Sequence, residues 1–226
     1  MKVSCLKKLY VPFDAREFIS AAKGCPDDPE RVAELWRLFE PLVFWRESGI
    51  KSNENGVIET ADGFRIESGY VAKGLKGCSR LAVLAVTAGK RLSLAPRELM
   101  EAGKLCDGAV ADMLGSYAAE AAADSFCDYL AARGSSKKLF LSLRFSPGYG
   151  DWSISEQGRV MDYLEGCAGE IELSAGNMLL PEKTITAAVG FSGAPIKKIY
   201  PVGDKSKGFC AGDKKCSECR TWECRR

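Results

Sequence analysis

The stretch KKLFLSLRFSPGYGD, residues 137–151, contains the pattern on which the fold prediction rests. In its first nine residues, apolar side chains stand at every second position: Leu139, Leu141, Leu143 and Phe145. Because alternate side chains of a strand share one face, this pattern predicts a β-strand with Arg144 on the opposite face. The following segment, SPGYGD, combines proline with glycines and predicts a tight loop.

Other helix and strand patterns surround this stretch. The run RLAVLAVT, residues 80–87, predicts a buried strand, and a helix is expected from Pro96 to about Arg133. A helix of about ten residues is expected from Ser155, then two strands near 171–180 and 184–191. Since strands and helices do not alternate regularly, we expect an α+β fold, with a mainly antiparallel twisted sheet flanked by helices.

The first third predicts short helices and a hairpin. Asp14 is placed to cap a helix that ends at Gly24, and Asp28 followed by Pro29 to begin another. Residues 57–68, with Asp62-Gly63 at the centre, predict a β-hairpin. We divide the chain into residues 1–75, which belong to the same domain or form their own lobe, a core at 76–195, and a basic tail at 196–226.

Composition excludes several classes of protein. The net charge of the 226 residues is only +2, so a polycation built for nucleic acid is not expected. No stretch approaches the roughly 18 apolar residues of a membrane helix, and the start MKVSCLKKLYVPF lacks the apolar core of a signal peptide. We therefore expect a cytoplasmic protein without a membrane partner. With no histidine in the sequence, imidazole bases and imidazole metal ligands are excluded.

The cysteines divide into two groups. In a reducing compartment the ten cysteines are expected to be thiols or metal ligands. Four lie together in the tail: Cys210, Cys216, Cys219 and Cys224. They suggest Zn²⁺ or an iron–sulfur cluster, and the alternative is a set of unliganded thiols. The other six are expected to be small core residues: Cys5, Cys25, Cys78, Cys106, Cys127 and Cys167.

The loop after the predicted strand suits a particular ligand chemistry. The guanidinium of Arg144 can hold a carboxylate or phosphate through two parallel hydrogen bonds. Pro147, Gly148 and Gly150 let the backbone turn and approach a ligand, and the ring of Tyr149 can cover an adenine or a sulfonium. These groups suit a zwitterionic amino acid joined to an aromatic base. The alternative is an ordinary turn whose tyrosine packs on the core.

The predicted long helix has acidic residues at four-residue spacing: Glu120, Asp124 and Asp128. Such residues share one helical face. They form a solvated face, or Asp124 turns inward and meets a ligand amine, because a buried carboxylate needs a cation.

The segment RFSPGYGD resembles the Arg-x-x-Pro-Gly-Tyr motif of the activation domain of cobalamin-dependent methionine synthase, and MLLPEKTITAAVGFSG, residues 178–193, is also similar. The resemblance implies that S-adenosylmethionine contacts Arg144, Tyr149 and the backbone at Ser146, within a loop that includes Pro147 and Gly148. It assigns the ligand's amino group to Asp124 and a second aromatic contact to Tyr200.

The resemblance also implies a function and partners. The chain would be a free-standing accessory protein that binds S-adenosylmethionine for the reductive reactivation of methionine synthase. The cobalamin would be held by the partner, and an electron donor such as flavodoxin would reduce it. Three alternatives remain: an activator of another corrinoid methyltransferase, a metal-stabilised binding module without methyl chemistry, or an independent methyltransferase. The last is disfavoured, because no glycine-rich nucleotide loop joins a strand to a helix.

Overall fold

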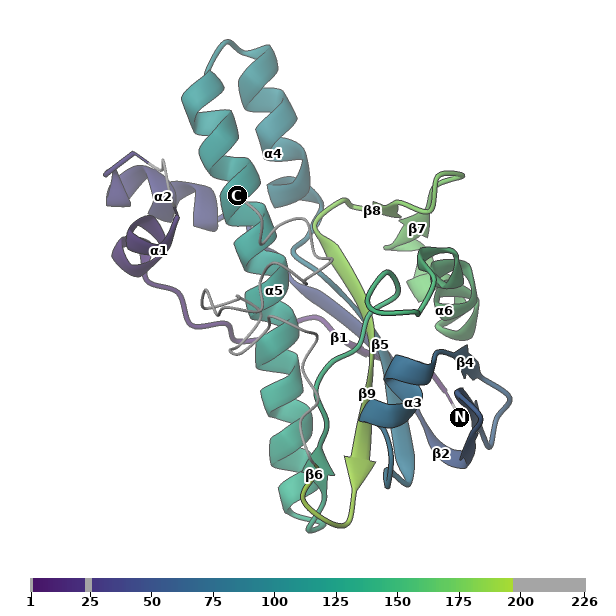
Figure 1. The fold of residues 1–226 in the computed structure, drawn as a ribbon. Coiled ribbons are helices and arrows are strands. Elements are labelled where there is room, and N and C mark those ends of the chain that lie inside the picture. The colour runs from purple at the N-terminus through teal and green to yellow at the C-terminus, as the bar shows by residue number, and fades with distance from the viewer. Residues whose placement is uncertain (1, 23–25, 197–226) are drawn as a thin grey trace, which may run out of the picture.

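The centre of the fold is an antiparallel sheet. The computed structural model describes residues 2–22 and 26–196. Seven strands form the sheet in the order β4-β3-β2-β5-β9-β6, and β1 pairs with β2 beside that path. Every pairing is antiparallel, and Figure 1 shows helices on both sides of the sheet. The expected α+β class with an antiparallel sheet is therefore confirmed.

The strands of this sheet are β1 (Ser4–Leu6), β2 (Leu42–Glu54), β3 (Val57–Thr60), β4 (Arg65–Glu67), β5 (Arg80–Thr87), β6 (Phe140–Leu141) and β9 (Thr184–Ser192). A separate two-stranded sheet consists of β7 (Glu172–Leu173) and β8 (Leu179–Leu180). The α-helices are α1 (Ala15–Ala21), α2 (Pro29–Trp36), α3 (Gly69–Gly74), α4 (Lys90–Glu101), α5 (Leu105–Ser135) and α6 (Gln157–Tyr163). Short 3-10 turns cover Ile154–Glu156 and Glu165–Gly169.

The C-terminal half of α5 crosses one face of the sheet, and its N-terminal half lies beside α4 (Figure 1). Small side chains at helical spacing, including Ala118, Ala122 and Ala123, are fully buried and let the helix approach the strands closely. Below them Phe126 and Leu130 pack against Trp45, Leu84 and other strand residues of the same face. Replacing a buried phenylalanine such as Phe126 by alanine costs about 3–5 kcal/mol, so this contact is a main attachment of α5.

The opposite face of the sheet is covered by different elements. Residues of α3 and α6, among them Val71 and Val160, pack there against alternate residues of the central strands, such as Leu81 and Val83. This division follows from the two-residue period of a strand, in which neighbouring side chains point to opposite faces. The near-continuous apolar run of β5 is therefore explained by burial on both faces.

Several local predictions are confirmed. Asp14 caps α1 and Asp28 caps α2, with Pro29 in the first turn. The hairpin at residues 57–68 is formed by β3 and β4, and β5 has the predicted bounds 80–87. Helix α6 and the turn before it occupy the region predicted after Ser155. Among the residues that the structure describes, no helix is both long and apolar enough to cross a membrane.

The helix predicted from Pro96 is wrong in its start and its continuity. Pro96 lies inside α4, which begins at Lys90, and a turn separates α4 from α5. Gly103 in this turn has φ +78°, a conformation that glycine adopts without strain and that ends the helix. The predicted strand near 171–180 is instead the short pair β7–β8, because residues 174–178 form the turn between them.

The longest strand was not predicted. β2 covers 13 residues and lies between β3 and β5 in the sheet. Its first half is a short apolar run, which does not distinguish a strand from a helix, and its second half is mostly polar. The polar half pairs with β3, where one face meets solvent, so hydrophobic periodicity was too weak to reveal it.

Candidate functional site

Arg144 lies where the segment after β6 gains one residue relative to β9. Leu141 pairs with Phe191, but Phe145 pairs with Ala188, where an unbroken register would place Arg144. Two residues, 143 and 144, therefore stand opposite the single residue 189, which is the arrangement of a β-bulge. A shift of one residue moves the following side chains to the other face.

The bulge corrects the predicted strand. Leu139 and Leu141 pack in the cluster on the α5 face, whereas Leu143 and Phe145 pack in the cluster on the opposite face. The continuous apolar face expected for residues 139–145 is therefore not formed, and the extended pairing stops at Leu141. Because of the bulge, the Arg144 side chain points toward α5 and reaches its carboxylates.

Two carboxylates of α5 meet the Arg144 guanidinium. Nη2 donates a hydrogen bond to Oε2 of Glu120, and Nη1 lies 3.5 Å from Oδ1 of Asp124. Burial lowers the pKa of Arg144, but the charges of Glu120 and Asp124 raise it by a larger amount. The pKa of Arg144 is therefore above its ordinary value. The guanidinium is therefore a fixed cation. Its side chain is 17% exposed, against 48% for Glu120 and 57% for Asp124.

The acidic face of α5 is thus neither fully solvated nor turned inward. Asp124 and Asp128 are exposed, and the inward position considered for Asp124 is not what the structure shows. Asp124 nevertheless lies beside the predicted site arginine. Glu120 was noted in the sequence only as part of the acidic face, and its contact with Arg144 depends on the bulge, for which the sequence gives no signal.

The loop from Ser146 to Trp152 is held by its own backbone. The N–H of Tyr149 donates to the carbonyl of Ser146 at 3.2 Å, and the N–H of Gly148 donates to the carbonyl of Trp152 at 2.7 Å. Trp152 is buried and Tyr149 is 44% exposed, so the loop is anchored from below while the tyrosine side chain remains accessible. Pro147 is buried as well, and Gly148 is exposed.

Asp151 attaches the loop to α3. Its carboxylate accepts hydrogen bonds from the Ser68 hydroxyl and from the backbone N–H groups of Gly69 and Tyr70. The Ser68 hydrogen bond is the main cause that lowers the pKa of Asp151, and the two backbone donors add to it. The sequence prediction did not include Asp151 in the site, although it ends the same motif.

The remaining predicted site residues are not among those that the structure describes. Tyr200 and the four tail cysteines, Cys210, Cys216, Cys219 and Cys224, lie outside the described residues. Within residues 2–22 and 26–196, no group of three or more acidic or cysteine side chains is arranged to hold a metal ion. In the same part of the chain, Cys78 and Cys167 are buried as expected, but Cys5 and Cys106 are exposed, so the expectation that they are core residues is wrong.

Comparison with known proteins agrees with this architecture. No protein-family model matches the sequence, and no curated protein matches it. A crystal structure of the MetH reactivation domain bound to AdoHcy is similar in fold, with a TM-score of 0.61 and 14% sequence identity. The similarity covers 88% of this chain and 81% of that one. The chain thus has a fold like that of the MetH reactivation domain, which belongs to methionine synthase.

Proposed function

We propose that this chain binds S-adenosylmethionine at the Arg144 loop and serves the reactivation of a cobalamin-dependent methionine synthase. The observation that carries the proposal is the pairing of Arg144 with acidic residues of α5, five residues before the accessible Tyr149, in a chain whose fold resembles a reactivation domain. That domain is bound to AdoHcy, the demethylated form of the proposed ligand, in its crystal structure.

The charges of the site are suited to an amino-acid zwitterion. Arg144 supplies a cation for the ligand carboxylate, and Asp124 or Glu120 supplies an anion for the ligand ammonium. A zwitterion that enters between them replaces one internal ion pair by two intermolecular pairs, so no charge is left buried without a partner. A purely structural arginine would also form internal ion pairs. The two acids, however, are about half-exposed and can move while Arg144 stays in place.

The rest of the ligand would be held by the loop. Tyr149 offers an accessible ring to the adenine or the sulfonium. Among the described residues, no hydrogen-bond acceptor faces the backbone N–H of Ser146. This amide is therefore available to a ligand.

The proposed action of the protein is positioning. When bound, S-adenosylmethionine would supply the methyl group that traps reduced cobalamin, and the cobalamin would be held by the partner protein. Arg144, Asp124 and Tyr149 would fix the orientation of the ligand so that its methyl group faces the partner. Such orientation can remove a large share of the activation barrier of a group transfer. No histidine base is needed in this chain. A flavodoxin-type donor is the proposed source of the electron, and a metal in the cysteine tail stays a separate prediction.

Calorimetric titration of the full chain with S-adenosylmethionine tests the proposal, with and without a cobalamin-loaded partner. We expect micromolar or weaker binding, loss of binding for Arg144→Ala, and at least about tenfold weaker binding for Arg144→Lys, which keeps the charge but not the planar fork. Arg97→Ala is the matched control, because Arg97 is 80% exposed and paired only along α4. Absence of binding by the wild type under both conditions would contradict the proposal.

A pull-down with each candidate corrinoid protein separates methionine synthase from another methyltransferase as the client. We expect retention of the methionine synthase cobalamin domain. If the chain binds S-adenosylmethionine but retains a different corrinoid protein, the client is that protein and the ligand assignment stands. If it binds neither ligand nor corrinoid protein, the chain is a binding module without methyl chemistry.

A further inference from the structure

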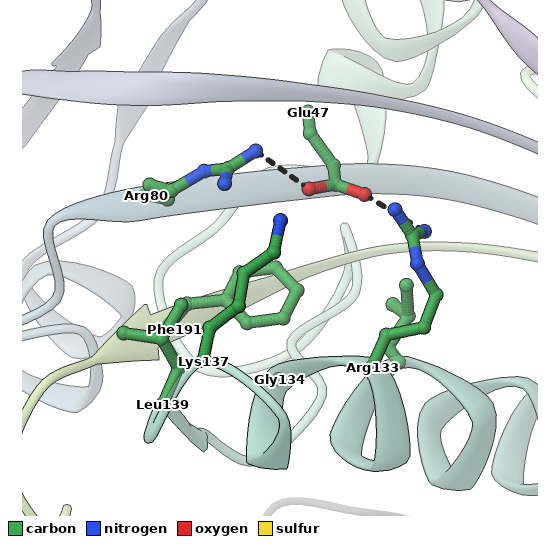
Figure 2. A pocket seen from close by; sticks show the side chains of 8 residues that line it. Glu47, Arg80, Arg133, Gly134, Lys137, Leu139 and Phe191 are labelled. Atoms are coloured by element: carbon green, nitrogen blue, oxygen red, sulfur yellow. Dashed lines mark hydrogen bonds and ion pairs between the residues drawn. The ribbon is translucent and has the colours of Figure 1, made fainter.

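A second group of charged residues lies at the C-terminal end of α5, away from the Arg144 loop. A small hollow is lined there by Glu47 of β2, Arg80 of β5, Arg133 of α5, and Lys137, two residues after the end of α5 (Figure 2). Apolar residues close its base: Leu130, Leu139 and Phe191. Because Arg133 follows Asp124 by nine residues, the hollow lies about 14 Å further along the helix axis. The two sites are therefore separate.

Glu47 holds the two guanidinium groups in place. Its Oε2 accepts a hydrogen bond from Arg80 at 2.8 Å, and its Oε1 accepts one from Arg133 at 3.2 Å. The indole N–H of Trp45 also donates to Oε1, at 3.3 Å. The Glu47 side chain is only 13% exposed, while those of Arg80 and Arg133 are 35% and 45% exposed. The carboxylate thus lies beneath two guanidinium groups whose outer N–H donors face solvent.

The positive charge of the hollow is not balanced. Three cations, Arg80, Arg133 and Lys137, surround the single carboxylate of Glu47, which leaves a local charge of about +2. Figure 2 shows the Lys137 ammonium turned toward the Arg80–Glu47 pair. In the described part of the chain no hydrogen bond or ion pair engages this ammonium. Cations in the last turn are favoured by the helix dipole, but the dipole does not explain why Arg80 of a strand joins them.

We propose that this hollow binds a dianionic oxyanion, such as the phosphate group of a small molecule or inorganic phosphate. Two guanidinium groups held by a largely buried carboxylate, together with one ammonium, provide N–H donors of the kind that bind phosphate oxygens. A dianion would neutralise the surplus of two charges. A monocarboxylate would leave one positive charge uncompensated, so the dianion is favoured.

The proposal is tested by titrating the full chain with inorganic phosphate at constant ionic strength, followed by NMR or calorimetry. We expect saturable binding, weakened about tenfold or more by Lys137→Gln, since one charge-assisted hydrogen bond is lost. Lys138→Gln is the matched control, because Lys138 is the next residue, carries the same charge and does not line the hollow. Sulfate should compete with phosphate, and chloride should not.

Three results would overturn the proposal: no saturable binding by the wild type, equal weakening by both lysine variants, or chloride competing as well as sulfate. The last two would indicate general attraction to a basic surface. A second variant of the hollow, Arg133→Gln, shows whether the effect is confined to Lys137. It should weaken phosphate binding as Lys137→Gln does. The affinity for a phosphorylated compound, such as a nucleoside monophosphate, is then compared with that for inorganic phosphate. This comparison distinguishes a phosphorylated metabolite from the free ion as the ligand.

Discussion

The Asp151 carboxylate accepts a hydrogen bond from the backbone N–H of Gly69 at 2.9 Å, and so joins the loop of the candidate site to the start of α3. The two residues are 82 positions apart in the sequence. Since α3 packs on the face of the sheet opposite α5, the loop is fixed to one face while Arg144 extends to the other. The site is therefore assembled across the edge of the sheet.

Asp151→Asn should loosen this attachment. The asparagine side chain keeps one acceptor oxygen, but its NH₂ group replaces the other oxygen. This NH₂ group is a donor and cannot accept from the backbone N–H groups that it would face. We expect a loss of roughly 1 kcal/mol in the free energy of unfolding, typical of a removed helix cap, together with weaker binding of S-adenosylmethionine. Urea unfolding and calorimetry measure the two effects. Asp162→Asn, at an exposed position of α6, is the control, and equal effects of the two variants would contradict the assignment.

Gly150 allows the loop to pass close to Tyr70. It has φ +61°, and a Cβ atom there would lie 2.7 Å from Cδ1 of Tyr70. Gly150→Ala should therefore destabilise the protein through both backbone strain and a clash. Gly103→Ala has the same backbone strain, at φ +78°, but its Cβ would meet no atom within 4 Å. We expect a larger loss of unfolding free energy for Gly150→Ala, measured in urea. Equal losses would show that the contact with Tyr70 is unimportant.

The elements that could be predicted from the sequence are those with local signals. The caps Asp14 and Asp28, the hairpin at Asp62-Gly63 and the apolar run of β5 each have a pattern within a few residues. The α+β class followed from their order. The start predicted at Pro96 was wrong, because proline is disfavoured inside a helix in general yet is tolerated in α4. The predicted continuity was wrong because the chain turns at Gly103 between α4 and α5.

The geometry of the candidate site could be predicted only in part. The motif itself identified Arg144 and Tyr149, whose ligand contacts stay predictions. What the sequence did not indicate was the bulge opposite residue 189, because a register shift is a property of two strands and not of one. For the same reason Glu120 and Asp151 were not recognised as partners of the site. Their contacts join segments 24 and about 80 residues apart.

The Asp62 carboxylate should make stability depend on pH in the acid range. Burial opposes ionisation, but hydrogen bonds from Ser48, Thr60 and Tyr163 and the charge of Arg46 lower its pKa from 3.8 to about 2. A lowered folded-state pKa stabilises the protein above pH 4, and this contribution is lost as the pH falls toward 2. The shift corresponds to roughly 2 kcal/mol.

Asp62→Asn tests that linkage. We expect the variant to be about 2 kcal/mol less stable at pH 7 and to lose less stability than the wild type between pH 4 and pH 2. Urea unfolding at several pH values gives both quantities. Glu98→Gln, on the exposed face of α4, serves as the control. If the wild type and Asp62→Asn show the same pH dependence, the carboxylate is not linked to folding.

The thiols of the folded core should react slowly with alkylating reagents. Burial raises the pKa of Cys78 from 9.0 to about 11, and burial is also the main cause that raises the pKa of Cys167 to about 12. A rise of two units leaves about 100-fold less thiolate, which is the reactive form. Cys106 is exposed on α5. Timed labelling with iodoacetamide and peptide mass spectrometry should therefore show Cys106 modified before Cys78 and Cys167 in the native protein, and similar rates for these three thiols in urea. Native labelling of Cys78 or Cys167 as fast as Cys106 would mean that the core opens around them.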